Sequence, residues 1–393
     1  MVRRVVLSLL LLLPLFANVT RRAVACPFCA AQSQTFTEEF ASMHVVTLAR
    51  LVSGPPTAKE KNVKSPTRPA DEVPKAVFEI TKVLKGKSLV GDVKRISTLY
   101  FGKAKPGQSF LIMGVDPPKI MWTTPLALTG GAEKYLTRLN AIPPEGAARL
   151  RFFQAHLEDA DEMLARDAYD EFAKAPYDWV TSLKKEMNHG QLIAWIKDED
   201  VPASRRRLYL TMLGVCGTSR DLPLLEELLR SDDRRKKAGL DAMIACYLTL
   251  RGPQGMPLVE ELFLKNKKAE YADTYAAIMA IRFHGTQSKL IPRKRLLIGL
   301  RYMLDRPQLA DLVIPDLAKW EDWSQMERLV SLFKDADEKS SWVRVPVINY
   351  LRACPLPQSK DRIKELEKVD PAAVKRARTF FPFGVNKKDP KAS

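Results

Sequence analysis

The chain has 393 residues, of which 46% are hydrophobic and 28% are charged, and its formal charge is +17. This much apolar material excludes intrinsic disorder for the bulk of the chain and suffices for two domains or one long repeat array. The four histidines and five cysteines show no metal-ligand spacing. Phosphate loops, nucleotide fingerprints and nucleophile elbows do not occur, so we assign no catalytic residue, metal ligand or cofactor.

The first 25 residues predict a secretory signal peptide. Arg3 and Arg4 precede an apolar run over 5–16, and Ala23-Val24-Ala25 supplies the small residues of a cleavage site before Cys26. The run is too short to span a bilayer, which takes about 20 apolar residues. We therefore expect an exported protein, periplasmic or extracellular, with no transmembrane segment. Membrane attachment is expected only if Cys26 is lipidated.

The mature chain would open with the tetrapeptide Cys26-Pro27-Phe28-Cys29. Export brings it into an oxidising compartment, so a local structural disulfide between Cys26 and Cys29 is our first interpretation. A catalytic dithiol is an alternative, because the tetrapeptide matches the motif of glutaredoxin-like proteins, which place it directly on a helix. Lipid attachment or an intermolecular bond also stays open. The next helix start is predicted at Thr35, with Glu38 completing a capping box.

The other three cysteines follow apolar helical patterns and are interpreted as buried thiols, which is the usual place of a free cysteine; they are Cys216, Cys246 and Cys354.

Residues 26–130 predict a small β module. Apolar, β-branched segments separated by turn residues indicate five strands, over 45–52, 76–84, 93–100, 109–115 and 120–128. The proline-rich stretch 55–74 predicts a long exposed loop. Strands this short and this closely spaced are typical of a small barrel or sandwich.

The order of the cysteine motif, strand 45–52, Val83-Leu84-Lys85-Gly86 and Pro106-Gly107-Gln108-Ser109-Phe110-Leu111 resembles the netrin-like modules, which include the tissue inhibitors of metalloproteinases. The resemblance implies an OB-type barrel. It also implies protease inhibition through an N-terminal cysteine, a role that only Cys26 could take. The family motif is Cys-x-Cys with disulfides to the barrel, whereas this chain has Cys-x-x-Cys and no other cysteine in the module.

Beyond residue 130 the pattern is helical. We expect a connector over 131–189, with helices over 133–139 and 147–172. Four acids of this connector are expected to form a solvated polar face rather than a cation site, because oxygen-ligand sites usually lie in loops with turn residues; they are Glu158, Asp159, Asp161 and Glu162.

An internal repeat is the strongest signal in the sequence. The block Leu222–Leu229 returns 34 positions later as Met256–Phe263, each with proline at its second position, and Ile291-Pro292 is a fainter echo. Between the blocks, 207–216 and 238–250 predict helices that stop at Gly217 and Gly252. A period in the mid-thirties predicts stacked helix pairs.

The segments 202–217 and 342–351 resemble HEAT-type repeats, which implies an α-solenoid over 190–370, followed by a basic tail over 371–393. The predicted fold class is therefore α+β and multidomain: a small N-terminal barrel of OB or netrin-like type, then an all-α HEAT-like solenoid. This order of parts resembles exported bacterial proteins without a known activity.

Basic clusters recur at about the repeat period. If stacked, they would form a positive stripe that attracts polyanions; solvated helix starts are the alternative interpretation. Nucleic acid is not the expected partner, because an exported protein rarely meets it. The candidate polyanion-binding residues are Arg205, Arg206, Arg207, Arg234, Arg235, Lys236, Lys237, Arg293, Lys294 and Arg295.

Three further residues receive structural interpretations. His284 is expected to cap a helix end rather than to act as a base. Of Trp320 and Trp323, one is expected in the core and one along a groove.

The function predicted from the sequence is that of a non-enzymatic binding or scaffold protein, whose solenoid surface engages a protein or a polyanionic partner. A thiol–disulfide oxidoreductase and a protease inhibitor are the alternatives, both acting through the N-terminal cysteines.

Overall fold

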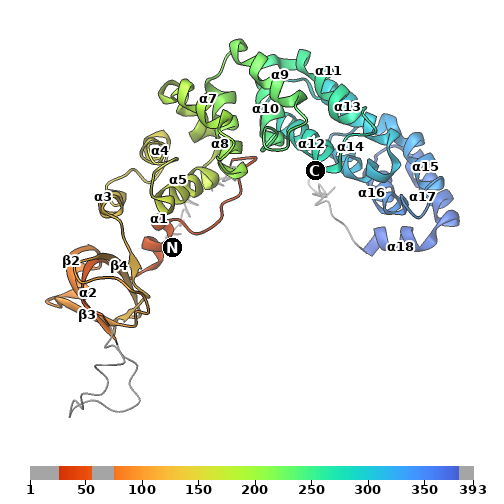
Figure 1. The fold of residues 1–393 in the computed structure, drawn as a ribbon. Coiled ribbons are helices and arrows are strands. Elements are labelled where there is room, and N and C mark those ends of the chain that lie inside the picture. The colour runs from red at the N-terminus through yellow and green to blue at the C-terminus, as the bar shows by residue number, and fades with distance from the viewer. Residues whose placement is uncertain (1–25, 55–74, 380–393) are drawn as a thin grey trace, which may run out of the picture.

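The structure of the protein is a computed structural model that describes residues 26–54 and 75–379. The predicted signal peptide, the predicted loop over 55–74 and residues 380–393 lie outside these ranges. The chain is an α+β protein. Near the N-terminus its strands form a nearly closed antiparallel barrel, and the helices that follow form a long arc (Figure 1).

The barrel consists of one antiparallel sheet in the order β3-β2-β1-β4-β5, with β6 also paired to β4. The strands lie where the sequence predicted them, except that two short strands replace the one expected over 120–128. Pro125 separates them, because proline has no N–H to donate to the ladder. The strands are β1 (Val45–Ser53), β2 (Ala76–Lys85), β3 (Arg95–Thr98), β4 (Ser109–Val115), β5 (Met121–Trp122) and β6 (Leu126–Ala127), with helix α2 (Lys87–Val90) after β2.

Strand β1 is buried on both sides, which explains its unbroken apolar run. Val46 and Leu48 belong to the core of the helical body, whereas Ala49 and Leu51 line the inside of the barrel. Strand β1 also pairs with both β2 and β4. It therefore belongs both to the barrel and to the core of the helical body, and it joins the two.

One helix, Phe36–Ser42, precedes the barrel, and the connector follows the barrel as a small helical layer. The helix predicted over 147–172 is two helices, broken over 155–161. Here the Asp159 carboxylate accepts the N–H of Asp161, and the Asp161 carboxylate accepts the N–H of Met163, so short polar side chains replace helical bonds. The helices are α1 (Phe36–Ser42), α3 (Gly130–Leu139), α4 (Ala147–Gln154), α5 (Glu162–Lys174) and α6 (Tyr177–Ser182).

The arc continues as two layers of stacked helices. Figure 1 shows α8, α10, α12, α14 and α16 along its inner side, and α9, α11, α13, α15 and α17 along its outer side. The helices are α7 (His189–Lys197), α8 (Ala203–Cys216), α9 (Leu222–Arg230), α10 (Leu240–Arg251), α11 (Met256–Val259), α12 (Tyr271–Thr286), α13 (Arg293–Arg301), α14 (Ile314–Lys319), α15 (Met326–Lys334), α16 (Arg344–Ala353), α17 (Gln358–Val369) and α18 (Pro371–Thr379).

Short helical turns of other types lie between these helices. They are the 3-10 turns η2 (Lys184–Glu186), η3 (Ser219–Asp221), η4 (Gly252–Gly255), η6 (Tyr302–Asp305), η7 (Pro307–Leu312), η8 (Trp323–Gln325) and η9 (Ser341–Val343), and the π-helical turn η5 (Glu260–Leu264).

The repeated sequence blocks begin equivalent helices. Pro223 and Pro257 lie in the first turns of α9 and α11, and Gly217 and Gly252 end α8 and α10, as predicted. The second block differs from the first in one respect, because it continues beyond α11 as the π-helical turn η5.

The prediction of a basic tail over 371–393 was wrong for its first nine residues, because these residues form the helix α18. Ala373, Val374 and Ala377 are buried against α16 and α17, while Lys375, Arg376 and Arg378 stay exposed. The basic residues therefore mark only the outer side of an amphipathic last helix.

Candidate functional site

Residues 26–35, which we call the strap, run along the inner side of the arc without regular secondary structure (Figure 1). The strap starts among α8, α10 and α12 and ends at the first turn of α1. The predicted local disulfide joins Cys26 and Cys29, whose Cα atoms are 5.2 Å apart. The N-terminal cysteine motif therefore lies on the helical body and not on the barrel.

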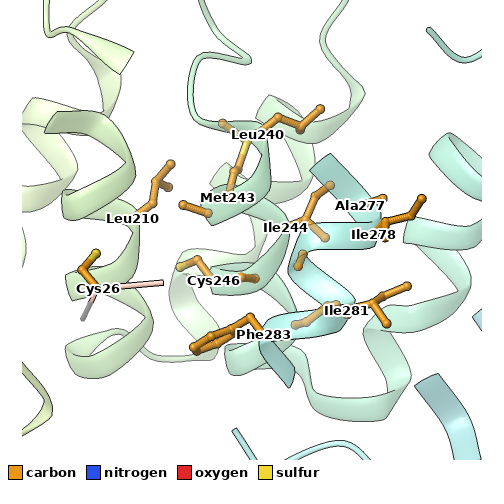
Figure 2. Packing of buried hydrophobic residues seen from close by; sticks show 14 of the residues in the cluster. Cys26, Leu210, Leu240, Met243, Ile244, Cys246, Ala277, Ile278, Ile281 and Phe283 are labelled. Atoms are coloured by element: carbon orange, nitrogen blue, oxygen red, sulfur yellow. The ribbon is translucent and has the colours of Figure 1, made fainter. Parts of the chain in front are cut away.

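The cysteine end of the strap is held by apolar contacts. The ring of Phe28 packs 5.3 Å from that of Phe283, and Cys26 is only 3% exposed. Figure 2 shows Cys26 among the same buried side chains as Leu210, Cys246 and Phe283. The cavity left beneath Phe28 is about 10 Å³, barely enough for one water molecule. A sulfur in this position is closed to large reagents.

The other end of the strap is held by a polar face of α5. Asp170 is fully buried, and its carboxylate accepts the backbone N–H groups of Gln32 (2.7 Å) and Ser33 (3.2 Å) and the hydroxyl of Ser33 (2.8 Å). Lys174, one turn further along α5, donates to the carbonyl of Ser33 at 2.9 Å. These contacts bind the main chain of an extended segment, so they depend little on its side chains.

The same face of α5 also caps α1. Asp167 accepts the N–H of Phe36 at 2.7 Å, which places a carboxylate at a helix N-terminus, where it is electrostatically favoured. The predicted capping box of Thr35 and Glu38 completes the cap. Glu171 accepts from the hydroxyl of Thr37 and pairs with Arg149, so each charged group of this face has a partner.

Burial affects the titration of Asp167. Desolvation raises its pKa to about 6, against the hydrogen bonds from Tyr135 and Phe36, which favour the charged form. The nearby carboxylates of Glu171 and Asp170 raise the pKa further. The hydroxyl of Tyr135, buried beside this carboxylate, has a pKa well above its ordinary value.

The remaining cysteines behave as structural groups. Cys246 and Cys354 are buried, as predicted, while Cys216 is partly exposed. Burial raises the pKa of the Cys246 and Cys216 thiols, which keeps them protonated at neutral pH.

The first basic cluster does not form a surface stripe, and the prediction was wrong for Arg205 and Arg206. These side chains are 8% and 1% exposed. Arg205 pairs with Glu158 and Glu162, whereas Arg206 donates to the backbone carbonyls of Asp198 and Arg235. Two of the four acids expected to be solvated therefore have an arginine partner. No metal-holding group of His, Cys, Asp and Glu occurs within 26–54 and 75–379.

Most of the other basic candidates pair with acids that lie one repeat further along the chain or one repeat back. Arg207 pairs with Asp241, 34 residues away, and Arg295 with Glu260, 35 residues away. The remaining pairs are Arg234 with Glu270 and Asp273, Lys237 with Asp273, and Arg235 with Glu199 at 3.7 Å.

Three of the predicted basic residues are left for a solvent-facing role. Arg293 lies over the ring of Trp320 at 5.8 Å. Lys236 and Lys294 are exposed, and neither has an ion pair in the part of the chain that the structure describes. The first two clusters lie next to each other, since Arg206 donates to the carbonyl of Arg235, but most of their charges are paired or buried and form no continuous positive stripe.

His284 does not cap a helix end, contrary to the sequence prediction. It is 1% exposed and its Nε2 lies 3.1 Å from the carbonyl of Ala245, so it bridges α12 to α10. Desolvation lowers its pKa to about 4. Trp320 is buried, and Trp323 is half-buried with its ring 5.1 Å from that of Tyr350. Both tryptophans therefore pack against the core.

No protein-family model, curated protein or solved structure matches the chain. Among the described residues, no helix is both long enough and apolar enough to cross a membrane. The site is therefore interpreted from its own geometry.

Asp170→Ala is expected to release the strap from α5. The substitution removes the acceptor of three hydrogen bonds and costs about 3 kcal/mol, since bonds to a buried charge exceed ordinary ones. Hydrogen exchange measured by mass spectrometry should show loss of protection over 26–35. The control is Asp178→Ala, an exposed acid nearby. Equal protection of the strap in both variants would contradict the role of Asp170 in holding it.

Cysteine alkylation tests the disulfide. In denaturant without reductant, three thiols should react, and reduction should make all five available. Under native conditions Cys216 should react first, since Cys246 and Cys354 are buried. Intact-mass measurement reads the number of adducts, and five adducts without reductant would show that Cys26 and Cys29 are free.

His284 and Asp167 should give opposite pH dependences of stability. The folded pKa of His284 lies below 6.5, so its contribution is lost as pH falls from about 6.5 to 4. The folded pKa of Asp167 lies above 3.8, so its contribution is lost as pH rises from about 4 to 6. Each amounts to about 3 kcal/mol across its window.

Urea unfolding between pH 4 and pH 7 separates the two groups. His284→Gln should flatten the acid-side loss, and Asp167→Asn should steepen the net loss on acidification, because His284 then acts alone. Parallel pH profiles for the two variants and the unchanged protein would rule out this assignment.

Proposed function

We propose that the chain is an exported, non-enzymatic binding or scaffold protein, in which a HEAT-like solenoid engages an extended segment of a protein partner. A barrel of OB or netrin-like type carries this solenoid. The observation that supports the proposal most is the strap itself, an extended segment held along the inner side of the arc by α5, α8, α10 and α12.

The contacts of the strap suit peptide recognition. Asp170 and Lys174 bind backbone N–H and C=O groups, and the ring of Phe28 packs against that of Phe283. Main-chain hydrogen bonds supply affinity and a side-chain pocket supplies specificity in known modes of extended-peptide recognition. The strap thus occupies one end of the proposed binding surface in the same molecule.

Beyond the strap, exposed aromatic side chains lie on α12 and just before α16. Tyr271 and Tyr275 on α12 are 56% and 38% exposed and stack with ring centroids 6.0 Å apart. Trp342, just before α16, is 47% exposed and donates its indole N–H to the carbonyl of Gln308. Exposed tyrosine and tryptophan are enriched where proteins bind one another.

A protein partner is favoured over a polyanion. Seven of the ten basic candidates are buried or paired with acids, so little unpaired positive charge remains for a polymer among these residues of the solenoid. Tyr271 and Tyr275 of α12, in contrast, are exposed to solvent.

The two alternative functions receive no support from the geometry. Inhibition through Cys26 needs an accessible N-terminal cysteine, and dithiol catalysis needs an exposed nucleophile at a helix start. Cys26 is buried, and α1 begins at Phe36, seven residues beyond Cys29. A lipid anchor on Cys26 would need the sulfur that the disulfide occupies, so we propose an exported protein without that anchor.

Site-specific photocrosslinking tests the proposal. Tyr275 of the full-length protein is replaced with p-benzoylphenylalanine, and Ile298, exposed on the outer helix α13, serves as the matched control. Irradiation in the native envelope should give a discrete protein adduct from position 275 only. Adducts of equal yield from both positions, or none from position 275, would contradict inner-face binding.

A further inference from the structure

The end of the barrel that points away from the helical arc presents apolar side chains to solvent. Val52, Leu99 and Phe101 are 38%, 40% and 82% exposed. The register places them together, because Ser53 pairs with Val77 and Thr98 pairs with the adjacent Ala76. We call this end, formed by Val52, Ser53 and residues 99–108, the barrel tip (Figure 1).

The outward position of Phe101 is enforced by Tyr100. The Tyr100 ring packs inside the barrel, 5.9 Å from Phe78 and 5.2 Å from Phe110, with both contacts edge to face. Its hydroxyl accepts the N–H of Ala104 at 3.3 Å. Because neighbouring residues of an extended chain point to opposite sides, an inward Tyr100 directs Leu99 and Phe101 outward.

Gly102 fixes the same loop. A Cβ at this position would lie 2.1 Å from the Tyr100 hydroxyl oxygen, closer than any side chain permits. The loop is therefore built around a partly buried tyrosine, and Phe101 is held at its surface by the packing beneath it.

The surroundings of the tip are strongly basic. Arg50, Arg95, Lys103 and Lys105 are exposed, and the structure records no ion pair for them within the described ranges. The acid nearest to them in the sheet register is Glu79, which pairs in register with Arg50 and Arg95. Residues 99–108 contain no acid at all.

We propose that the barrel tip docks on an anionic lipid surface, with Phe101 inserted at the level of the headgroups. The apolar side chains are exposed at one end of the barrel, Phe101 most of all, so they suit insertion into a soft surface. A projecting aromatic flanked by lysines is the chemistry of interfacial binding, in which apolar burial adds to attraction by anionic headgroups. Each lysine near such a surface contributes a several-fold increase in affinity.

Vesicle co-sedimentation of the full-length protein tests this proposal. Binding is expected to vesicles of phosphatidylcholine mixed with phosphatidylglycerol, and to weaken as salt is raised. Phe101→Ser should reduce binding about tenfold, and Lys103→Glu combined with Lys105→Glu by tenfold or more. The matched control is Leu290→Ser, at an exposed apolar residue of the helical body, and this variant should bind as before.

Two outcomes would overturn lipid docking. One is the absence of binding to anionic vesicles, which would leave the tip as a contact for a protein. The other is equal binding by Phe101→Ser and the unchanged protein. Thermal unfolding of each variant shows that it is folded; because Phe101 is 82% exposed, its replacement should leave the midpoint unchanged.

Discussion

The buried carboxylate of Asp170 accepts three hydrogen bonds, all of them from Gln32 and Ser33 of the strap. A carboxylate without solvent must be satisfied within the protein, and no other part of the described chain supplies donors to it. The inward face of α5 is therefore complete only when the strap lies on it. Asp167, on the same face, caps α1, and α1 leads directly into β1. The position of the first strand thus depends on the same row of acids that fixes the strap.

Much of the fold follows from local patterns. The capping box at Thr35 and Glu38 marked the start of α1. In the repeat, prolines marked the starts of α9 and α11, and glycines marked the ends of α8 and α10. Two breaks in helices and strands were not predicted, because there the preference of a single residue overrides the apolar periodicity of the segment. Asp159 and Asp161 shape the break before α5, with Asp161 as the N-cap of that helix, and Pro125 divides a strand. At α18 the basic composition concealed three buried apolar residues, because charge on one helix face says nothing about the other.

The site was less accessible to sequence reasoning than the fold. The disulfide was expected because its two cysteines are neighbours, but its position on α8, α10 and α12 depends on contacts far apart in sequence. Asp170 lies 138 residues from Gln32, and no motif marks it as an acceptor. For the basic clusters a signal did exist. The repeat offset of 34 residues carries Arg207 to Asp241 and Arg282 to Asp316, so the sequence period itself could have identified the pairs between repeats.

The two proposed surfaces lie on parts of the molecule that are joined firmly. Val46 and Leu48 of β1 share the core of the helical body. At the junction, Lys85 donates to the carbonyls of Phe40 and Ala41, and Asn140 donates to that of Leu84. An interface made of both shared core and hydrogen bonds resists relative movement of the parts more than a polar linker would. The barrel tip and the inner side of the arc are consequently held in one orientation. A lipid surface in contact with Phe101 would therefore also determine where the aromatic residues of α12 meet a partner.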